Sequence, residues 1–107
     1  MTNADCKKLA RLVHGALSAF DGAVTAAPET PEPWASGIFE GARCMLRVTL
    51  KGPGADRAAD RFLRDMTERE WAAPGHIVAD IGLLDEVRKD GGEEVVLRLE
   101  ALLIEAE

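Results

Sequence analysis

The sequence has no tyrosine, and its only aromatic residues are three phenylalanines and two tryptophans. None of them falls on the outer face of the β-sheet predicted below, although a sheet that reads RNA stacks bases on exposed aromatic rings. A net charge of -6 at pH 7 also repels nucleic acid and anionic membranes. We therefore expect neither nucleic acid nor a membrane as a partner.

Long apolar runs and cysteines are also scarce. No run of about 18 apolar residues is present, which excludes a membrane-spanning helix. The start of the chain, MTNADCKK, lacks the basic and apolar segments of a secretory signal, so we expect a cytoplasmic protein. The two cysteines, Cys6 and Cys44, each fall on the apolar face of a predicted element. We expect separate packed thiols, because a disulfide would need an oxidising compartment that nothing else in the sequence suggests.

Motifs that carry catalysis or bind metal are missing as well. The sequence offers no metal-ligand cluster, no nucleophile elbow and no Cys/His motif, so we expect no metal and no cofactor. His76 and Asp80 share a strand face after Trp71, but four residues along a strand span about 13 Å, too far for one metal ion. A small-molecule pocket near Trp34, Trp71, His76 and Asp80, with Cys44 close by, is the alternative function that we keep open.

At 107 residues and 47% apolar content, the chain has the size of one domain with one core. We divide residues 1–107 into a helix at 1–24, a proline-rich loop at 25–41 and a β-α-β-β unit at 42–107. In the helix, apolar residues recur at the i, i+3, i+4 spacing from Asp5 to Val24, with Asn3 as the N-cap. Three prolines within 28–33 predict the loop, and residues 38–40 are a possible strand start.

The β-α-β-β unit begins with clean alternation from Ala42 to Lys51, which predicts a half-buried strand. A second amphipathic helix follows from Ala55, and residues 67–70 resemble a capping box, which predicts a short further turn that carries Trp71. Residues 77–89 and 94–105 then alternate as the two arms of a hairpin.

A three-residue loop, Asp90-Gly91-Gly92, sets the predicted register of the hairpin. It pairs odd with odd residues and brings both apolar faces together, whereas a one-residue slip would separate them. In this register Val87 faces Val95, Leu83 faces Leu99 and Ala79 faces Leu103.

The predicted fold is therefore α+β, with the order α-β-α-β-β and an antiparallel sheet of three to four strands that has two helices on one face. If the second helix is a right-handed crossover, the first two strands are parallel and the third lies between them, antiparallel to both. This split βαβ unit is half of a ferredoxin-like fold. The analogy is topological and implies no function.

The outer face of the sheet is less polar than a solvated face should be. Its predicted apolar residues are Met45, Val78, Leu84, Val96, Leu102 and Ile104. A contiguous apolar patch marks an interface, and we expect a second copy of the chain to cover it. The alternative is that residues 25–41 fold over it. The leading functional hypothesis is thus a non-catalytic, acidic, cytosolic interaction or regulatory domain that forms a homodimer and has a possible protein partner.

Overall fold

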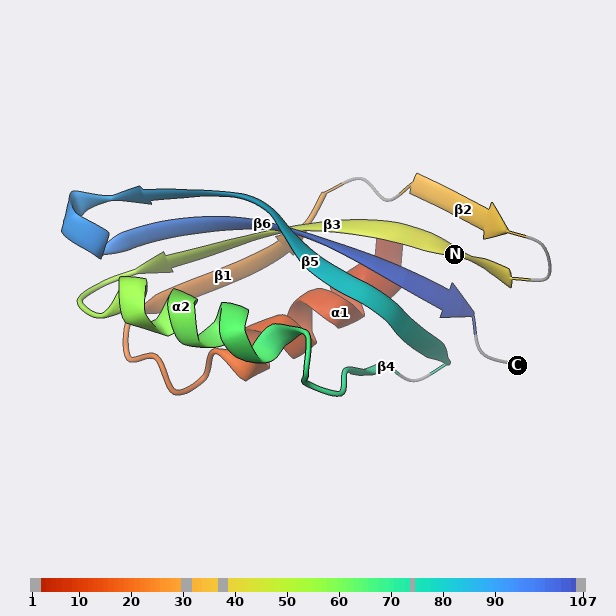
Figure 1. The fold of residues 1–107 in the computed structure, drawn as a ribbon, viewed down its shortest axis with the longest axis horizontal. Coiled ribbons are helices and arrows are strands. Elements are labelled where there is room, and N and C mark those ends of the chain that lie inside the picture. The colour runs from red at the N-terminus through yellow and green to blue at the C-terminus, as the bar shows by residue number, and fades with distance from the viewer. Residues whose placement is uncertain (1–2, 30–31, 37–38, 74, 106–107) are drawn as a thin grey trace.

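Three long antiparallel strands form the centre of the sheet: β3 (Phe39–Lys51), β5 (His76–Lys89) and β6 (Glu94–Glu105). The computed structural model describes residues 3–29, 32–36, 39–73 and 75–105. Within them the strand order is β1-β3-β6-β5-β4, and β2 also pairs with β3. Figure 1 shows the β5–β6 hairpin running the length of the molecule.

The predicted α+β class is confirmed, and so is the position of β6 between β3 and β5, antiparallel to both. Helix α2 (Ala55–Met66) connects β3 to the strands that follow it. The sheet is wider than predicted because three short strands extend it: β1 (Ala23–Pro28), β2 (Glu32–Ser36) and β4 (Ala72–Ala73). The ferredoxin-like analogy is not confirmed.

Helices α1 (Asn3–Ala16) and α2 lie on the same face of the sheet (Figure 1). Their apolar stripes and the inward faces of β3 and β6 form one core. Its largest fully buried side chains are Leu9, Leu46, Leu50, Leu97, Leu99, Leu103, Val13, Val48, Val95, Cys6 and Cys44. The alternation predicted for Ala42–Lys51 and the stripe predicted for α2 are therefore confirmed where the side chains are described.

The first helix is shorter than predicted: α1 ends at Ala16, and Val24 lies in β1. The spacing of apolar residues does not distinguish the two structures at this point. Val24 fits the helical stripe, and it fits equally well a strand on which alternate residues are half-buried. Gly22 lies between the two elements. A Cβ there would be 2.3 Å from the carbonyl oxygen of Lys51, so the close approach of these two backbones requires glycine.

The predicted loop at 25–41 is also wrong, because its described parts are β1, β2 and the start of β3. Both short strands pair with the same side of β3, so each is an edge strand. Proline is tolerated there because an edge strand does not need every N–H for the ladder. Pro28 closes β1 opposite Leu46, and Pro33 lies in β2 opposite Ala42. Pro31 and Ile38 lie outside the described residues.

Residues 67–70 form turns rather than the predicted further helical turn. The N–H groups of Glu68 and Arg69 donate to the carbonyl oxygen of Asp65, which ends α2. The indole N–H of Trp71 donates to the carbonyl oxygen of Met66 at 3.0 Å. The polar residues that suggested a helix start therefore terminate the preceding helix instead.

The predicted hairpin register holds in the middle and fails at both ends. Leu83 pairs with Leu99 as predicted, but β-bulges between Val78 and Asp80 and between Leu83 and Asp85 shift the pairing on either side. As a result Val87 pairs with Val96 instead of Val95. A bulge adds one residue to one strand, so the residues beyond it change faces.

Arg88 is the clearest product of this change of face. It pairs with Val95, whose side chain is buried in the core, so it lies on the helix side of the sheet. Its guanidinium forms ion pairs with Asp56 and, at 2.7 Å, with Asp60, both on α2. These hydrogen bonds raise the pKa of Arg88 above its ordinary value, Asp60 contributing most. Because of the bulge, β5 contacts α2 through these ion pairs as well as through apolar side chains.

Candidate functional site

Among the residues whose side chains the structure describes, the exposed large hydrophobic ones all lie on β5. They are Ile77, Leu83, Leu84 and Val87, exposed by 56%, 40%, 44% and 48%. Large apolar side chains are usually buried, and several exposed ones on one strand indicate a surface that binds another molecule. Among the side chains that the structure describes, no other element carries such a group.

Strand β5 also has a free edge. On the side away from β6, β4 pairs only with His76 and Ile77. From Val78 to Lys89, β5 has no strand partner on that side among the residues that the structure describes. The two bulges interrupt this edge, which is one way in which proteins limit uncontrolled edge pairing. The free edge of β5 can thus pair with another strand, but only with one whose backbone follows the two bulges.

The register places the outer-face residues of β3, β6 and β5 in cross-strand rows. From the turn towards the chain end, three of these rows are Thr49–Val96–Val87, Arg47–Arg98–Asp85 and Arg43–Leu102–Asp80. Ile104 and Ile77 form a further apolar pair beyond them. The charged row Arg47–Arg98–Asp85 therefore separates the Val96–Val87 pair from Leu102 and from the Ile104–Ile77 pair.

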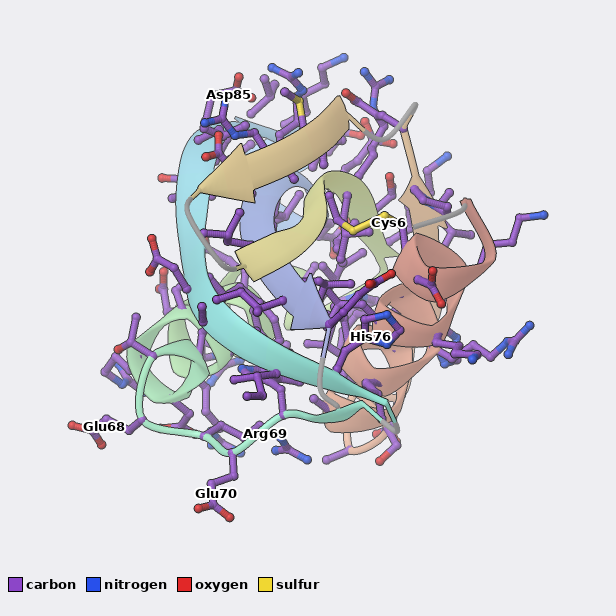
Figure 2. All side chains as sticks on the ribbon, turned by 90° about the vertical axis from the view of Figure 1, so that its right-hand side faces the viewer. Cys6, Glu68, Arg69, Glu70, His76 and Asp85 are labelled. Atoms are coloured by element: carbon purple, nitrogen blue, oxygen red, sulfur yellow. A yellow bond between two sulfur atoms is a disulfide. The ribbon has the colours of Figure 1, made fainter. Side chains whose placement is uncertain are left out.

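Arg98 is the centre of that charged row. Its Nε and Nη2 donate to the two carboxylate oxygens of Glu29, each at 3.3 Å, and its Nη1 donates to Asp85 at 2.7 Å. Arg47 lies 3.5 Å from Glu29. The hydrogen bonds from Arg98 lower the pKa of Glu29 below its ordinary value of 4.5. These contacts of Arg98 and Arg47 link Glu29, the residue after β1, to β3, β6 and β5. Figure 2 shows Asp85 on the opposite side of the molecule from Arg69.

This arrangement corrects the predicted interface in two ways. Val78 pairs with Leu103 on the inner face and packs against the core, because of the bulge that follows it. Val96 lies on the turn side of the charged row, whereas Leu102 and Ile104 lie beyond it, so these residues do not form one patch. Of the other two predicted interface residues, Met45 lies opposite Glu100 and Leu84 is the extra residue of a bulge.

Two charged residues of β5, Asp80 and Lys89, form no ion pair with any other described residue. Asp85 and Glu86 bind arginines, and Arg88 binds α2. Asp80 and Lys89 remain, both exposed and paired with outer-face positions of β6. The cross-strand neighbour of Lys89, Glu94, binds Lys51 at 3.6 Å. Opposite charges therefore flank the exposed apolar residues Leu83, Leu84 and Val87.

The residues predicted to line a small-molecule pocket do not come together. Trp34 lies in β2 opposite Gly41, and Asp80 lies on the outer face opposite Leu102. His76 lies on the helix side, 3.8 Å from Asp5. Trp71 lines a cleft that includes neither His76 nor Asp80.

That cleft lies between the end of α1, the residues that follow it, and α2, and it encloses about 340 Å³. Its apolar lining includes Leu17, Phe20, Phe62, Met66 and Trp71, and its charged residues are Arg57, Arg61, Arg69, Asp21 and Asp65. The sequence does not reveal this cleft, because its periodicity extends the predicted helix over Phe20, whereas the turn after Ala16 brings this ring beside α2.

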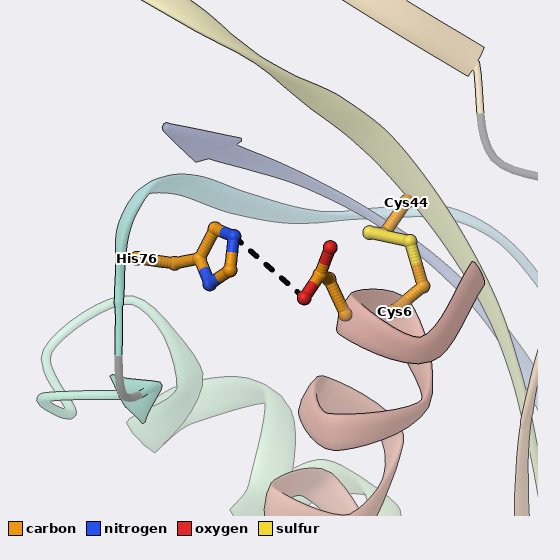
Figure 3. The surroundings of a disulfide bond; sticks show 4 residues. Cys6, Cys44 and His76 are labelled. Atoms are coloured by element: carbon orange, nitrogen blue, oxygen red, sulfur yellow. Dashed lines mark ion pairs between the residues drawn. A yellow bond between two sulfur atoms is a disulfide. The ribbon is translucent and has the colours of Figure 1, made fainter. Parts of the chain in front are cut away.

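Cys6 and Cys44 form a disulfide, so the prediction of two separate thiols is wrong. The bond joins α1 to β3 within the core, and Figure 3 shows it beside the Asp5–His76 ion pair. The sequence held a usable signal: both cysteines fall on apolar faces, and a helix that packs on a sheet brings those two faces together.

No group of three or more His, Cys, Asp or Glu side chains that could hold a metal ion occurs in the described part of the chain. None of its helices is long and apolar enough to cross a membrane. No protein-family model matches the sequence, and neither a curated protein nor a solved structure shows significant similarity to it.

Proposed function

We propose that this protein is a non-catalytic interaction or regulatory domain that acts as a homodimer through β5. One observation carries the proposal: among the described side chains, the exposed large hydrophobic ones gather on the strand that has a free edge. A second copy would cover these side chains and supply hydrogen-bonding partners for the unpaired backbone, which is how edge strands commonly bind other strands.

Charge complementarity favours a second copy over an unrelated protein. A two-fold axis would place the two β5 strands antiparallel. Residue i of the first copy then contacts residue j of the second, and residue j of the first contacts residue i of the second. With the axis near Leu84 and Asp85, Asp80 of each copy approaches Lys89 of its partner. These are the two β5 charges without an ion pair in the described chain. The surface therefore complements itself.

The alternative cover, residues 25–41, receives no support from the fold. Its described parts pair beside β3, and β6 separates β3 from β5. They extend the opposite side of the sheet and leave the exposed residues of β5 uncovered.

A charge-exchange series tests the dimer. We expect sedimentation at low micromolar concentration to show a dimer for the natural sequence, and a monomer for Asp80→Lys and for Lys89→Asp, because each single change places like charges opposite each other. The double variant, Asp80→Lys with Lys89→Asp, should restore the dimer. A strict monomer for the natural sequence contradicts the proposal, as does a double variant that dissociates as readily as the single ones.

Apolar substitutions test the same surface independently. Leu84→Glu should convert the dimer to a monomer, since a carboxylate would have to be buried in the contact. Ala27→Glu is the matched control, because Ala27 is exposed at the opposite edge of the same sheet and pairs with Arg47. If both variants dissociate, net charge rather than the β5 contact explains the effect, and the proposed interface is wrong.

The cellular location stays a prediction within this proposal. A cytoplasmic location fits the acidic composition, but the Cys6–Cys44 disulfide weighs against it, because disulfides form and persist mainly in oxidising compartments.

A further inference from the structure

The cleft between α1 and α2 has the properties of a small-molecule site. Its volume of about 340 Å³ falls within the range of ligand pockets, roughly 300–1,000 Å³. The helices that line it, α1 and α2, cover one face of the sheet (Figure 1), and none of its lining residues belongs to β5. A ligand in the cleft would therefore not contact the β5 surface of the proposed dimer.

The apolar lining of the cleft is held in place without a ligand. Leu17, Phe62 and Met66 are almost fully buried. Trp71 is fixed by its indole hydrogen bond to Met66, and its ring meets that of Phe62 edge-on at 6.2 Å between centroids. Because these side chains already have fixed partners, a ligand that enters need not order them first.

The charged residues of the cleft favour an anion. Three arginines line it, against two aspartates. Arg57, Arg61 and Arg69 form no ion pair with any described residue, although Asp65 lies four positions from both Arg61 and Arg69. The Arg69 guanidinium lies 5.3 Å from the centroid of the Trp71 ring, a cation–π contact that keeps it beside the apolar lining.

We propose that this cleft binds a small amphipathic carboxylate, a molecule with an apolar body and one carboxylate group. The body would cover Phe20, Phe62 and Trp71, which are the aromatic residues of the lining. The carboxylate would accept hydrogen bonds from Arg57 and Arg61. Arginine suits this role because its planar guanidinium matches a carboxylate with two parallel hydrogen bonds.

Titration followed by amide NMR tests this inference. The probes are decanoate, decanol and decylammonium, which share one chain and differ in charge, with 2-naphthoate as an aromatic carboxylate. We expect decanoate or 2-naphthoate to shift the Trp71 indole signal and the amide signals of residues 17–21 and 57–62. Decanoate or naphthoate should bind about tenfold more tightly than decanol, since a charge-assisted contact contributes roughly that factor.

Variants locate the binding and keep the test independent of folding. Arg57→Gln with Arg61→Gln should remove the preference for the carboxylate over decanol while leaving the spectrum of the free protein folded. Arg64→Gln is the matched control, an exposed arginine of α2 that does not line the cleft. Ala58→Phe should fill the cleft and weaken binding of every probe.

Three results would overturn the inference: no probe shifts the cleft signals, decanol or decylammonium binds as tightly as the carboxylates, or the double glutamine variant keeps the carboxylate preference. Loss of the dimer in the charge-exchange series would leave these outcomes unchanged, because none of the cleft variants lies on β5.

Discussion

Arg88 shows how one inserted residue changes the role of a side chain. A regular hairpin in the predicted register, with Leu83 opposite Leu99, would place it on the outer face opposite Glu94. The bulge between Leu83 and Asp85 instead places it opposite Val95, where it binds Asp56 and Asp60 of α2. Alternation along β5 contains no sign of the extra residue, so this contact was not predictable from the sequence.

Glu29 gives a residue-scale prediction about pH. Its pKa is lowered in the folded state by Arg98, so the stabilisation is complete above the ordinary value of 4.5 and is lost as pH falls through the lower folded value. We expect Glu29→Gln to lower the urea midpoint at pH 7 and to lose less on acidification to pH 3 than the natural sequence does. Equal losses on acidification in the two proteins would show that this pair does not contribute.

Gly92 gives a second prediction at this scale. Its φ of +92° is one that L side chains rarely adopt, and a Cβ there would lie 2.8 Å from the Cβ of Asp56. Gly92→Ala should therefore cost more than the ~1 kcal/mol of an unfavourable φ alone. Gly91→Ala is the control, since Gly91 has φ +65° but open space around it. The urea midpoints should rank natural sequence, Gly91→Ala, Gly92→Ala.

At the scale of elements, the predictions succeeded where one face of an element is buried along its whole length. Strand β6 alternates between buried and half-exposed residues from Val95 to Leu103 without a break, and α2 shows one apolar stripe. Both were predicted correctly. The register of β5 and the structure of residues 17–29 and 32–36 were not, because bulges, turns and edge pairing depend on contacts with distant residues such as Gly22 with Lys51.

The alternation of β6 makes a direct prediction. Leu97 is fully buried, so Leu97→Ala should cost about 2–5 kcal/mol of unfolding free energy. Val96 lies next to it on the other face and is only half-buried, so Val96→Ala should cost about 1 kcal/mol or less. Chemical unfolding at a concentration at which sedimentation shows a monomer measures both. Similar costs would mean that β6 does not present one face to the core.

At the scale of the whole molecule, the candidate sites lie on opposite sides of one sheet. The helix side carries the core, the disulfide and the cleft, whereas the outer side carries the charged row and the exposed residues Ile77 and Val87 of β5. Because the core lies between the two surfaces, a substitution on one of them should leave the other intact. The fold thus permits self-association and ligand binding in the same protein.

The disulfide makes a prediction about global stability. It links residues 38 positions apart, so the loop-closure model gives about 4 kcal/mol of stabilisation through the unfolded chain. Reductant should lower Tm by roughly 15 °C in a chain of this size. A Cys6→Ala, Cys44→Ala variant should start from the lower Tm and show no response to reductant. An unchanged Tm of the natural sequence after complete reduction would contradict this account.

The sequence by itself determined the α+β class, the central strands, α2 and the position of β6 between β3 and β5, because hydrophobic periodicity and chain connectivity are local properties. Only the tertiary structure decided the end of α1, the two bulges, the disulfide and the cleft. Each of these depends on which distant surfaces meet, and the two apolar faces that carry Cys6 and Cys44 become one bond only when α1 packs on β3.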